Sequence, residues 1–476
     1  MSELKDKTVK GVAWSAVERF STQGITFVFN ILIARILLPE DYGVVAMLGI
    51  FMAIAKTFID SGFTTALIRK TDRTDADYST VFYFNIVVSV FFCLLLWLTA
   101  PLIAAFYKIP LLVSITRVIS LTLVINSFRA VQETILNIEM KFRLRSVITI
   151  VCVVVIGVVG LWMAKNGYGV WALVVQSIVG NILRTILMWI LVDWRPRWIF
   201  SRKSFREMFS FGSKMLGSSL LDTLYSNIYG LVIGKVFSST SLGLYGKADS
   251  FAAFPSSSLT SLLQSVTYPA LSTIQNDNDR LKGAYKRLLN VSAFVIFPLM
   301  VGLASVADPL VRIVLTDKWS GMIYILQIIC FAQMWYPIHA INLNILLVKG
   351  RSDYFLKLEI VKKIVCTVIL CATVPFGIIV MCYGNVLSSL ICLVINTHYN
   401  KELINYGILS QMKDMSPIII LSLVMGVAVW LIVGVLPILW LKLVVGIAVG
   451  GAIYLSGAAI FQFPELRELL NIVKRK

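Results

Sequence analysis

The sequence predicts an all-α membrane protein with fourteen transmembrane helices, in which two parallel six-helix repeats are followed by a helix pair. Three observations predict this fold class. Apolar residues make up 58% of the 476 positions and charged residues only 14%, with a mean hydropathy of +0.84, whereas soluble domains have roughly 45–50% apolar and about 25% charged residues. Basic residues concentrate in alternate connections between the apolar segments. Landmarks of the first half recur in the second half at a nearly constant offset.

The apolar segments are long enough to cross a bilayer, which takes about 20 residues in a helix. Their hydropathy predicts spans at 11–37, 42–68, 80–106, 111–138, 146–165, 169–193, 207–236, 242–272, 286–314, 320–347, 355–375, 378–399, 416–436 and 438–461. The first segment contains Glu18, Arg19 and Arg35 and no cleavage site follows it. We therefore expect a retained helix and not a signal peptide.

The distribution of basic residues predicts the orientation of the chain. When the spans are numbered alternately, the connections on one side hold only Lys108, Lys165 and Lys318, and the other side holds most of the remaining loop Lys and Arg residues. The side rich in basic residues is the cytoplasmic one in membrane proteins. Both termini are therefore expected in the cytoplasm. The net charge of +18 follows this pattern and does not indicate a nucleic-acid partner.

An internal repeat relates the two halves of the chain. Arg35 precedes Gly43 by eight residues, and Lys235 precedes Gly243 by the same interval, 200 positions later. Two further landmarks recur 208 positions apart, namely Lys141-Phe142-Arg143 with Lys349-Gly350-Arg351, and Gly169 with Gly377. Because each repeat has an even number of helices, the repeats are parallel, as in transporters that rock two lobes about a central cavity. The predicted domains are 1–200, 201–406 and a C-terminal helix pair with its tail at 407–476.

Several mixed-chemistry stretches carry a family resemblance. They are KTVKGVAWSA, ARILLPEDYG, FIDSGFTTALIRK, IEMKFR, YPALSTIQNDNDRLKGAYKRLL, TDKWSGMIYILQIIC and LLVKGRSDY, of which the last three are the most specific. These stretches resemble the oligosaccharide flippases of the multidrug/oligosaccharidyl-lipid/polysaccharide (MOP) exporter superfamily, most closely the colanic-acid exporter type. The resemblance runs to about residue 400. The last two spans match in hydropathy only.

The resemblance implies a fold and an activity. The fold is a V-shaped pair of six-helix lobes that works by alternating access. The substrate is an undecaprenyl-pyrophosphate-linked oligosaccharide, flipped from the cytoplasmic to the outer leaflet of the bacterial inner membrane during O-antigen, capsule or exopolysaccharide synthesis. A monomer among membrane lipids is the family-level expectation, and polysaccharide assembly proteins are conceivable partners.

Basic residues within the spans are the candidate substrate ligands. An ionisable side chain in a span costs about 2.5–3.5 kcal/mol on insertion scales and usually faces a cavity or a partner. Arg and Lys suit a pyrophosphate shielded from water. The first and seventh spans are equivalent in the repeat, and so are the second and eighth. We therefore predict a cavity formed by Arg19, Lys56, Lys214 and Lys247, with Arg35 and Lys235 at its outer rim.

The same residues also allow structural interpretations. Lys56 and Asp60 are four positions apart, as are Arg129 and Glu133, so each pair could neutralise itself on one helix face. Residues near span ends could instead extend to the membrane surface; these are Arg35, Arg184, Lys235 and Arg312.

Motifs for catalysis and for ATP hydrolysis are missing from the sequence. It has two histidines, no H-E-x-x-H and no G-x-x-x-x-G-K-[ST]. We therefore expect neither an enzyme nor a cofactor nor a metal. Export of an anion from an inside-negative cell gains about 2.3 kcal/mol per charge per 100 mV, so the membrane potential is the expected driving force. A coupled proton could be carried by Glu18, Asp60, Glu133 or Asp222.

Two other functions compete with this one. The first is a multidrug/toxin cation antiporter of the same superfamily, which the excess of basic residues within the spans disfavours. The second is a non-transporting membrane scaffold for envelope assembly. A transfer assay with lipid-linked oligosaccharide separates the flippase from the other two.

Overall fold

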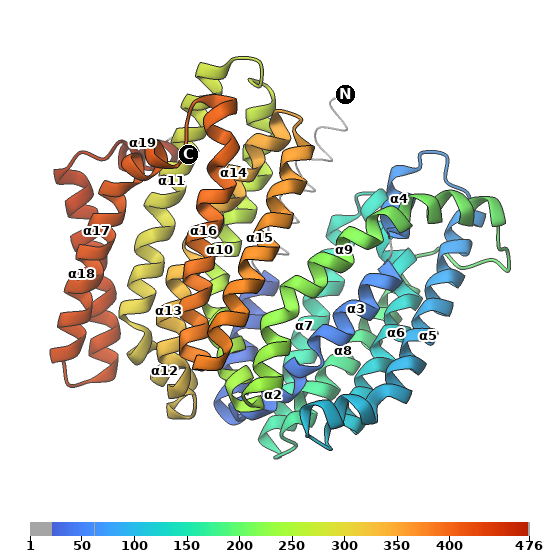
Figure 1. Ribbon diagram of the computed structural model, residues 1–476. Helices are drawn as coiled ribbons and strands as arrows, with labels where there is room; N and C mark the ends of the chain where they lie inside the picture. Colours follow the sequence, from blue (N-terminus) through green and yellow to red (C-terminus); the bar gives the residue numbers. More distant parts are fainter. Residues whose placement is uncertain (1–20, 61, 475–476) are drawn as a thin grey trace. The chain divides into compact units, whose positions relative to one another are not determined.

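The computed structural model describes residues 21–60 and 62–474 (Figure 1), and all regular structure in these ranges is helical. Ten helical stretches of the described residues are long and apolar enough to span a membrane, when Pro39–Arg69 and Asp317–Val348, each made of several helices, are counted as one stretch each. The all-α membrane class is thereby confirmed, whereas the count of fourteen spans stays a prediction. The chain forms two compact units, Met1–Gly243 and Leu244–Lys476. The lobe boundaries expected at 200 and 406 also stay predictions.

The first unit is built from helix Ser21–Ile36 and eight further helices. These are α2 (Pro39–Met47), α3 (Gly49–Asp60), α4 (Phe63–Arg69), α5 (Asp75–Tyr107), α6 (Leu112–Ile138), α7 (Phe142–Lys165), α8 (Val170–Leu191) and α9 (Arg202–Val236). Helix α6 packs along α5 and α8, α8 packs on α7, and α9 packs on α3. We call the end of this unit that carries connections 70–74, 139–141 and 192–201 its basic end.

Two local features decide where helices of the first unit begin. The span predicted at 42–68 is divided, and α4 begins after Gly62, whose φ of +76° favours glycine. A Cβ on Gly62 would lie 2.8 Å from Cα of Gly212 on α9. Helix α5 begins five residues before the predicted span because Thr74 and Asp77 form a capping box, which extends the helix past its apolar part.

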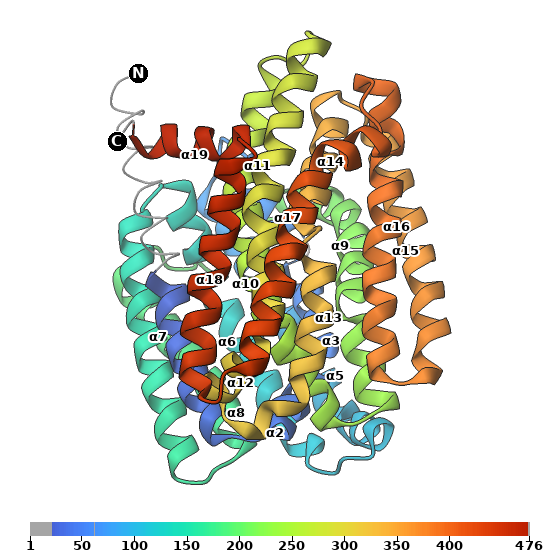
Figure 2. The same ribbon diagram turned by 90° about the vertical axis from the view of Figure 1, so that its left-hand side faces the viewer.

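The second unit surrounds the central helix α11 (Asn278–Ser305), which packs against α13 (Ile323–Gln333), α14 (Tyr336–Val348) and α17 (Ile408–Val435). Its other elements are α10 (Ser239–Ser272, which begins in the first unit), α12 (Ala307–Leu315), η1 (Asp317–Met322), α15 (Ser352–Thr373), η2 (Val374–Phe376), α16 (Ile378–Ile404), α18 (Leu439–Ile460) and α19 (Pro464–Lys474). The C-terminal pair α17 and α18 runs side by side in both views (Figures 1 and 2).

A buried polar cluster joins four helices of the second unit. Tyr285 of α11, Asn342 of α14, Asn400 of α16 and Gln411 of α17 are each completely buried. The Tyr285 hydroxyl donates to Oδ1 of Asn342 at 2.5 Å, and the Asn400 and Gln411 amides donate to the same oxygen at 2.8 and 3.0 Å. Because buried polar groups are costly without partners, this cluster fixes how the four helices pack.

Candidate functional site

A polar cavity lies inside the first unit, between α3, α4, α6 and α9. Its volume is about 430 Å³. Most of its lining residues carry a hydroxyl, amide or carboxylate group, and the lining consists of Thr57, Asp60, Gly62, Thr64, Thr65, Ala130, Glu133, Thr134, Asn137, Met215, Leu216 and Ser219. We call this space the polar cavity.

Helical spacing explains why these side chains line one space. The four lining residues of α6 fall at positions i, i+3, i+4 and i+7, which share one helix face. Thr57 and Asp60 are three apart on α3. The hydroxyls of Thr57 and of Thr223 on α9 are hydrogen-bonded at 2.8 Å, which joins α3 to α9 at the cavity wall. The interruption of the helix at Gly62 separates α3 from α4 beside the cavity.

Glu133 connects the cavity to two arginines. Its Oε1 accepts a hydrogen bond from Nε of Arg129 at 3.0 Å, and Nε of Arg184 on α8 lies 2.9 Å from the same oxygen. The Nη1 of Arg129 also donates to Oδ1 of Asn181 at 3.0 Å. The predicted pairing of Arg129 with Glu133 is therefore confirmed. Arg184 does not extend to the membrane surface, because its guanidinium pairs with Glu133 instead.

Asp60 is the second carboxylate of the polar cavity. Its side chain is exposed, and it forms no hydrogen bond or ion pair with a described side chain. The pairing of Asp60 with Lys56 expected from their spacing is not formed within the described ranges, and Lys56 is exposed without lining the cavity. Asp60 therefore offers its oxygens to whatever enters the cavity.

The other predicted ligands lie elsewhere. Lys235, near the end of α9, donates to the carbonyl of Phe106 at 2.5 Å and lies 4.1 Å from the centroid of its ring. Arg35 is exposed near the end of its helix, and Asp222 is exposed on α9. Lys247 belongs to the second unit, where its Nζ lies 5.7 Å from the ring centroid of Trp319.

Three predicted residues have no described side chain. Glu18 and Arg19 lie outside the described residues, and Lys214 is on α9 with its side chain undescribed. The structure thus brings Asp60 and Glu133 together in the polar cavity. Sequence reasoning missed Thr64, Thr65 and Ser219.

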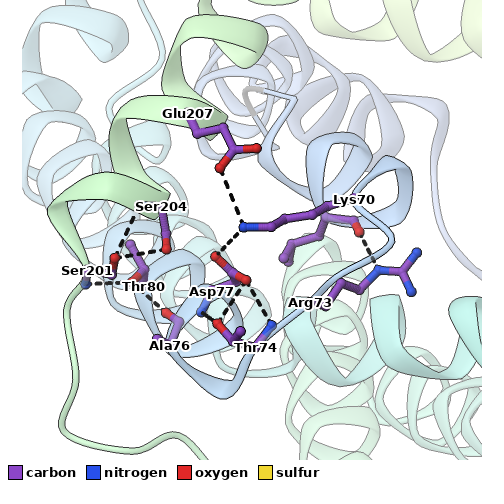
Figure 3. A network of polar contacts seen from close by, with 10 residues as sticks. Lys70, Arg73, Thr74, Ala76, Asp77, Thr80, Ser201, Ser204 and Glu207 are labelled. Carbon is purple, nitrogen blue, oxygen red and sulfur yellow. Dashed lines mark hydrogen bonds and ion pairs between the residues drawn. The ribbon is translucent and has the colours of Figure 1, made fainter.

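A polar clasp holds α4, α5 and α9 together at the basic end of the unit (Figure 3). Nζ of Lys70 donates to Oδ1 of Asp77 at 3.0 Å and to Oε2 of Glu207 at 3.4 Å. The backbone N–H of Ser201 donates to the hydroxyl of Thr80 at 3.0 Å. Burial lowers the pKa of Lys70, but the hydrogen bonds and charges of Asp77 and Glu207 together outweigh this effect, so the pKa is raised above its ordinary value.

The family described as "Polysaccharide biosynthesis protein" matches residues 32–324. Among similar proteins, the teichuronic acid biosynthesis protein TuaB of Bacillus subtilis (strain 168) is 25% identical over 356 residues, which are 74% of this chain and 74% of that protein. The lipopolysaccharide biosynthesis protein WzxC of Escherichia coli (strain K12) is 24% identical over 369 residues, 75% of this chain and 73% of that protein. The succinoglycan biosynthesis transport protein ExoT of Rhizobium meliloti (strain 1021) is 25% identical over 66% of this chain and 64% of that protein.

Solved structures share the fold at low sequence identity. The lipid II flippase MurJ, in an inward closed conformation, superposes with a TM-score of 0.77 at 17% identity and covers 96% of this chain and 100% of its own. An inward-facing multidrug resistance MATE family transporter of the MOP superfamily has a TM-score of 0.62 at 15% identity, over 79% of this chain and 95% of its own. The chain therefore shares the fold of these transporters, as the sequence led us to expect, while the arrangement as two parallel six-helix repeats stays a prediction.

Proposed function

Because this chain belongs to the polysaccharide biosynthesis protein family, we propose that it is a flippase for a lipid-linked oligosaccharide. The substrate is an undecaprenyl-pyrophosphate-linked repeat unit, moved from the cytoplasmic to the outer leaflet of the bacterial inner membrane by alternating access of two six-helix lobes. Three relatives bear names in polysaccharide biosynthesis or transport, and one neighbour in fold is a lipid II flippase.

The polar cavity is the observation that carries this proposal. Sugars present many hydroxyls, which bind to carboxylate, amide and hydroxyl groups. The cavity supplies these groups from four helices, and its carboxylate Asp60 is free to accept sugar hydroxyls. Its volume falls within the range of about 300–1,000 Å³ that is usual for small-molecule sites, which is sufficient for part of an oligosaccharide.

The anionic part of the substrate needs a different environment. We assign the pyrophosphate to the cationic set Arg19, Lys56, Lys214 and Lys247, with Arg35 and Lys235 at the rim, as the sequence predicts. Their charges attract the pyrophosphate, while the membrane potential favours its outward movement by about 2.3 kcal/mol per charge per 100 mV. Glu18, Asp60, Glu133 and Asp222 are the candidate carriers of a coupled proton.

A transfer assay in proteoliposomes tests the proposal. Fluorescent undecaprenyl-pyrophosphate oligosaccharide is reconstituted with the protein, and the label that reaches the other leaflet is quenched. Asp60→Asn should slow transfer about ten-fold, because a hydrogen bond to a charged group contributes about 1.5–3 kcal/mol. Asp279→Asn is the matched control, since Asp279 is exposed in the first turn of α11. Equal transfer by empty liposomes and protein-containing liposomes would refute the function, whereas normal transfer by Asp60→Asn would refute only the site.

A cation antiporter is the second candidate, and one observation favours it: both ionisable residues that line the polar cavity are acidic. Two arginines pair with Glu133, however, whereas Asp60 has no ion-pair partner among the described residues, and the nearby charge that acts in its favour is that of Lys56 on the same helix. Proton-driven uptake of a lipophilic cation into the same proteoliposomes, lost in Asp60→Asn, would favour the antiporter over the flippase.

A further inference from the structure

A second pocket lies on the opposite side of the Arg129–Glu133–Arg184 cluster, between α6, α7 and α8. Its volume is about 310 Å³. The two arginines line this pocket, whereas Glu133 lines the polar cavity. The cluster therefore separates two spaces of different character. We call the second space the arginine pocket.

The guanidinium groups in the arginine pocket have unused hydrogen-bond donors. An arginine has five N–H groups, and Glu133 is the one carboxylate among described residues that pairs with Arg129 and Arg184. The buried Nε of Arg184 lies close to Glu133 but forms no hydrogen bond of good geometry with a described group. Two guanidiniums and one carboxylate leave a net charge of +1. Such a site attracts an anion.

Arg129 and Arg184 lie too far from the basic end of the unit to be ordinary surface residues. Arg184 lies seven residues before the end of α8 and Arg129 nine residues before the end of α6, so at 1.5 Å per residue they are about 10 and 14 Å inside the basic end. An unpaired charge at this depth is costly. Glu133 and Asn181 hold the guanidinium of Arg129 in place before any ligand arrives, and the ion pair with Glu133 holds that of Arg184.

An apolar wall made by Val153, Ile156 and Leu173, with Ser177 and Gln176 between them, extends the arginine pocket beyond the guanidiniums. Helix α8 lines the pocket with Arg184, Asn181, Gly180, Ser177, Gln176 and Leu173 in order from the basic end, while antiparallel α7 contributes Val153 and, against Gly180, Ile156. The apolar wall begins about one helical turn or two beyond the guanidiniums. A small inorganic anion would leave this wall unused. A ligand that carries a phosphate at one end and a hydrocarbon chain at the other fills both parts.

We propose that the arginine pocket binds a phosphate ester of a long hydrocarbon chain, with Arg129 and Arg184 holding the phosphate through charge-assisted hydrogen bonds. A polyprenyl phosphate and a bilayer phospholipid share this chemistry. The site goes beyond the proposed transport function, because a lipid that stays bound would occupy it equally well. Binding at this site is therefore measured separately from transfer.

Native mass spectrometry of the full-length protein in detergent tests the site with three probes. These are undecaprenyl phosphate, undecaprenol (the same chain without the phosphate) and phosphatidylglycerol. The wild type should bind undecaprenyl phosphate about ten-fold more tightly than undecaprenol, because the arginines recognise only the phosphate. In Arg129→Gln/Arg184→Gln this preference should fall below about three-fold.

The control is Arg117→Gln on the same helix, whose guanidinium stacks 4.3 Å from the ring centroid of Trp97 and does not line the pocket. It should keep the wild-type preference. Val153→Phe narrows the apolar part of the pocket and leaves the charged cluster unchanged. It should weaken the binding of all chain-bearing probes. This variant provides a second test if the double variant does not fold. Tight phosphatidylglycerol binding that the double variant loses would identify a bilayer-lipid site, and selectivity for undecaprenyl phosphate would identify a carrier-lipid site. Equal affinities for undecaprenyl phosphate and undecaprenol in the wild type, or an unchanged preference in the double variant together with undiminished binding of the chain-bearing probes by Val153→Phe, would overturn the inference.

Discussion

Gly43 of α2 and Gly243 of α10 lie where these two helices cross. Gly43 lies against the backbone of Ser239, four positions before Gly243, and Gly243 lies against the backbone of Pro39, four positions before Gly43. A Cβ on Gly43 would lie 1.7 Å from the carbonyl oxygen of Ser239, and a Cβ on Gly243 would lie 1.8 Å from that of Pro39. Pro39 and Ser239 are 200 positions apart, as are the two glycines. Each helix therefore makes the same contact with the other, through residues that are 200 positions apart in the sequence.

Gly43→Ala and Gly243→Ala should each destabilise the protein, because neither backbone carbonyl can move away without shifting a helix. Overpacking of this kind costs about 1–3 kcal/mol. Gly246→Ala on the same α10 is the matched control: its Cβ would meet nothing within 4 Å, so helix propensity should make it neutral or slightly stabilising. Thermal unfolding in detergent, followed by tryptophan fluorescence, provides the measurement. A Gly43→Ala protein as stable as the control would contradict the close crossing.

Lys70→Met should loosen the polar clasp at the basic end. Asp77 is almost completely buried, and the change removes its cationic partner. A hydrogen bond to a charged group contributes about 1.5–3 kcal/mol, so unfolding should occur at lower temperature. Lys203→Met is the control, because Lys203 is an exposed lysine near the start of α9. If both variants melt together, the clasp contributes nothing to stability.

The stability from Lys70 should also depend on pH. The folded protein raises the pKa of this lysine, so protonated Lys70 favours the folded state. This contribution is complete below the ordinary lysine pKa of about 10.4 and is lost as the pH rises through the folded pKa. The difference in unfolding temperature between wild type and Lys70→Met should therefore stay constant between about pH 7 and about pH 9, and it should shrink in strongly alkaline solution. A difference that grows with alkalinity would have the wrong sign.

Glu133 should be energetically coupled to its two arginines. Glu133→Gln leaves Arg129 and Arg184 without a counter-charge inside the bundle, which destabilises the fold. In a double-mutant cycle with Arg184→Gln, residues in direct contact typically give coupling energies of about 0.5–3 kcal/mol. Arg117→Gln, on the same helix as Glu133 but not paired with it, should show additive effects. Additivity in both cycles would mean that the ion pairs are energetically silent.

Tyr285→Phe should destabilise the second unit. The change removes a donor to Asn342 and an acceptor for Asn400 and Gln411, all within a completely buried cluster. Unsatisfied buried groups cost about 1–3 kcal/mol. Tyr324→Phe is the control, because the Tyr324 side chain is 72% exposed. Equal melting temperatures for the two variants would show that water replaces the lost hydroxyl.

Much of the helical architecture was predictable from hydropathy. The predicted span 111–138 matches α6, and 438–461 matches α18 within one residue at either end, because a run of apolar residues in lipid must satisfy its backbone hydrogen bonds within a helix. The division of the span at 42–68 was not predictable from hydropathy. It arises from one left-handed glycine that lies against another helix.

Charge placement shows where sequence reasoning ends. The sequence by itself determined that this is a multi-pass helical membrane protein that resembles polysaccharide biosynthesis proteins, because this follows from residues close together along the chain. By the same four-residue spacing that also allowed a Lys56–Asp60 pair, it allowed the Arg129–Glu133 pair. Only the tertiary structure decided that Arg184 joins that pair, that Lys56 and Asp60 do not pair, and that Thr64 and Ser219 line one cavity. The contacts of Arg184, Thr64 and Ser219 join helices far apart in sequence, and the separation of Lys56 from Asp60 depends on how side chains pack around a single helix, neither of which periodicity alone specifies.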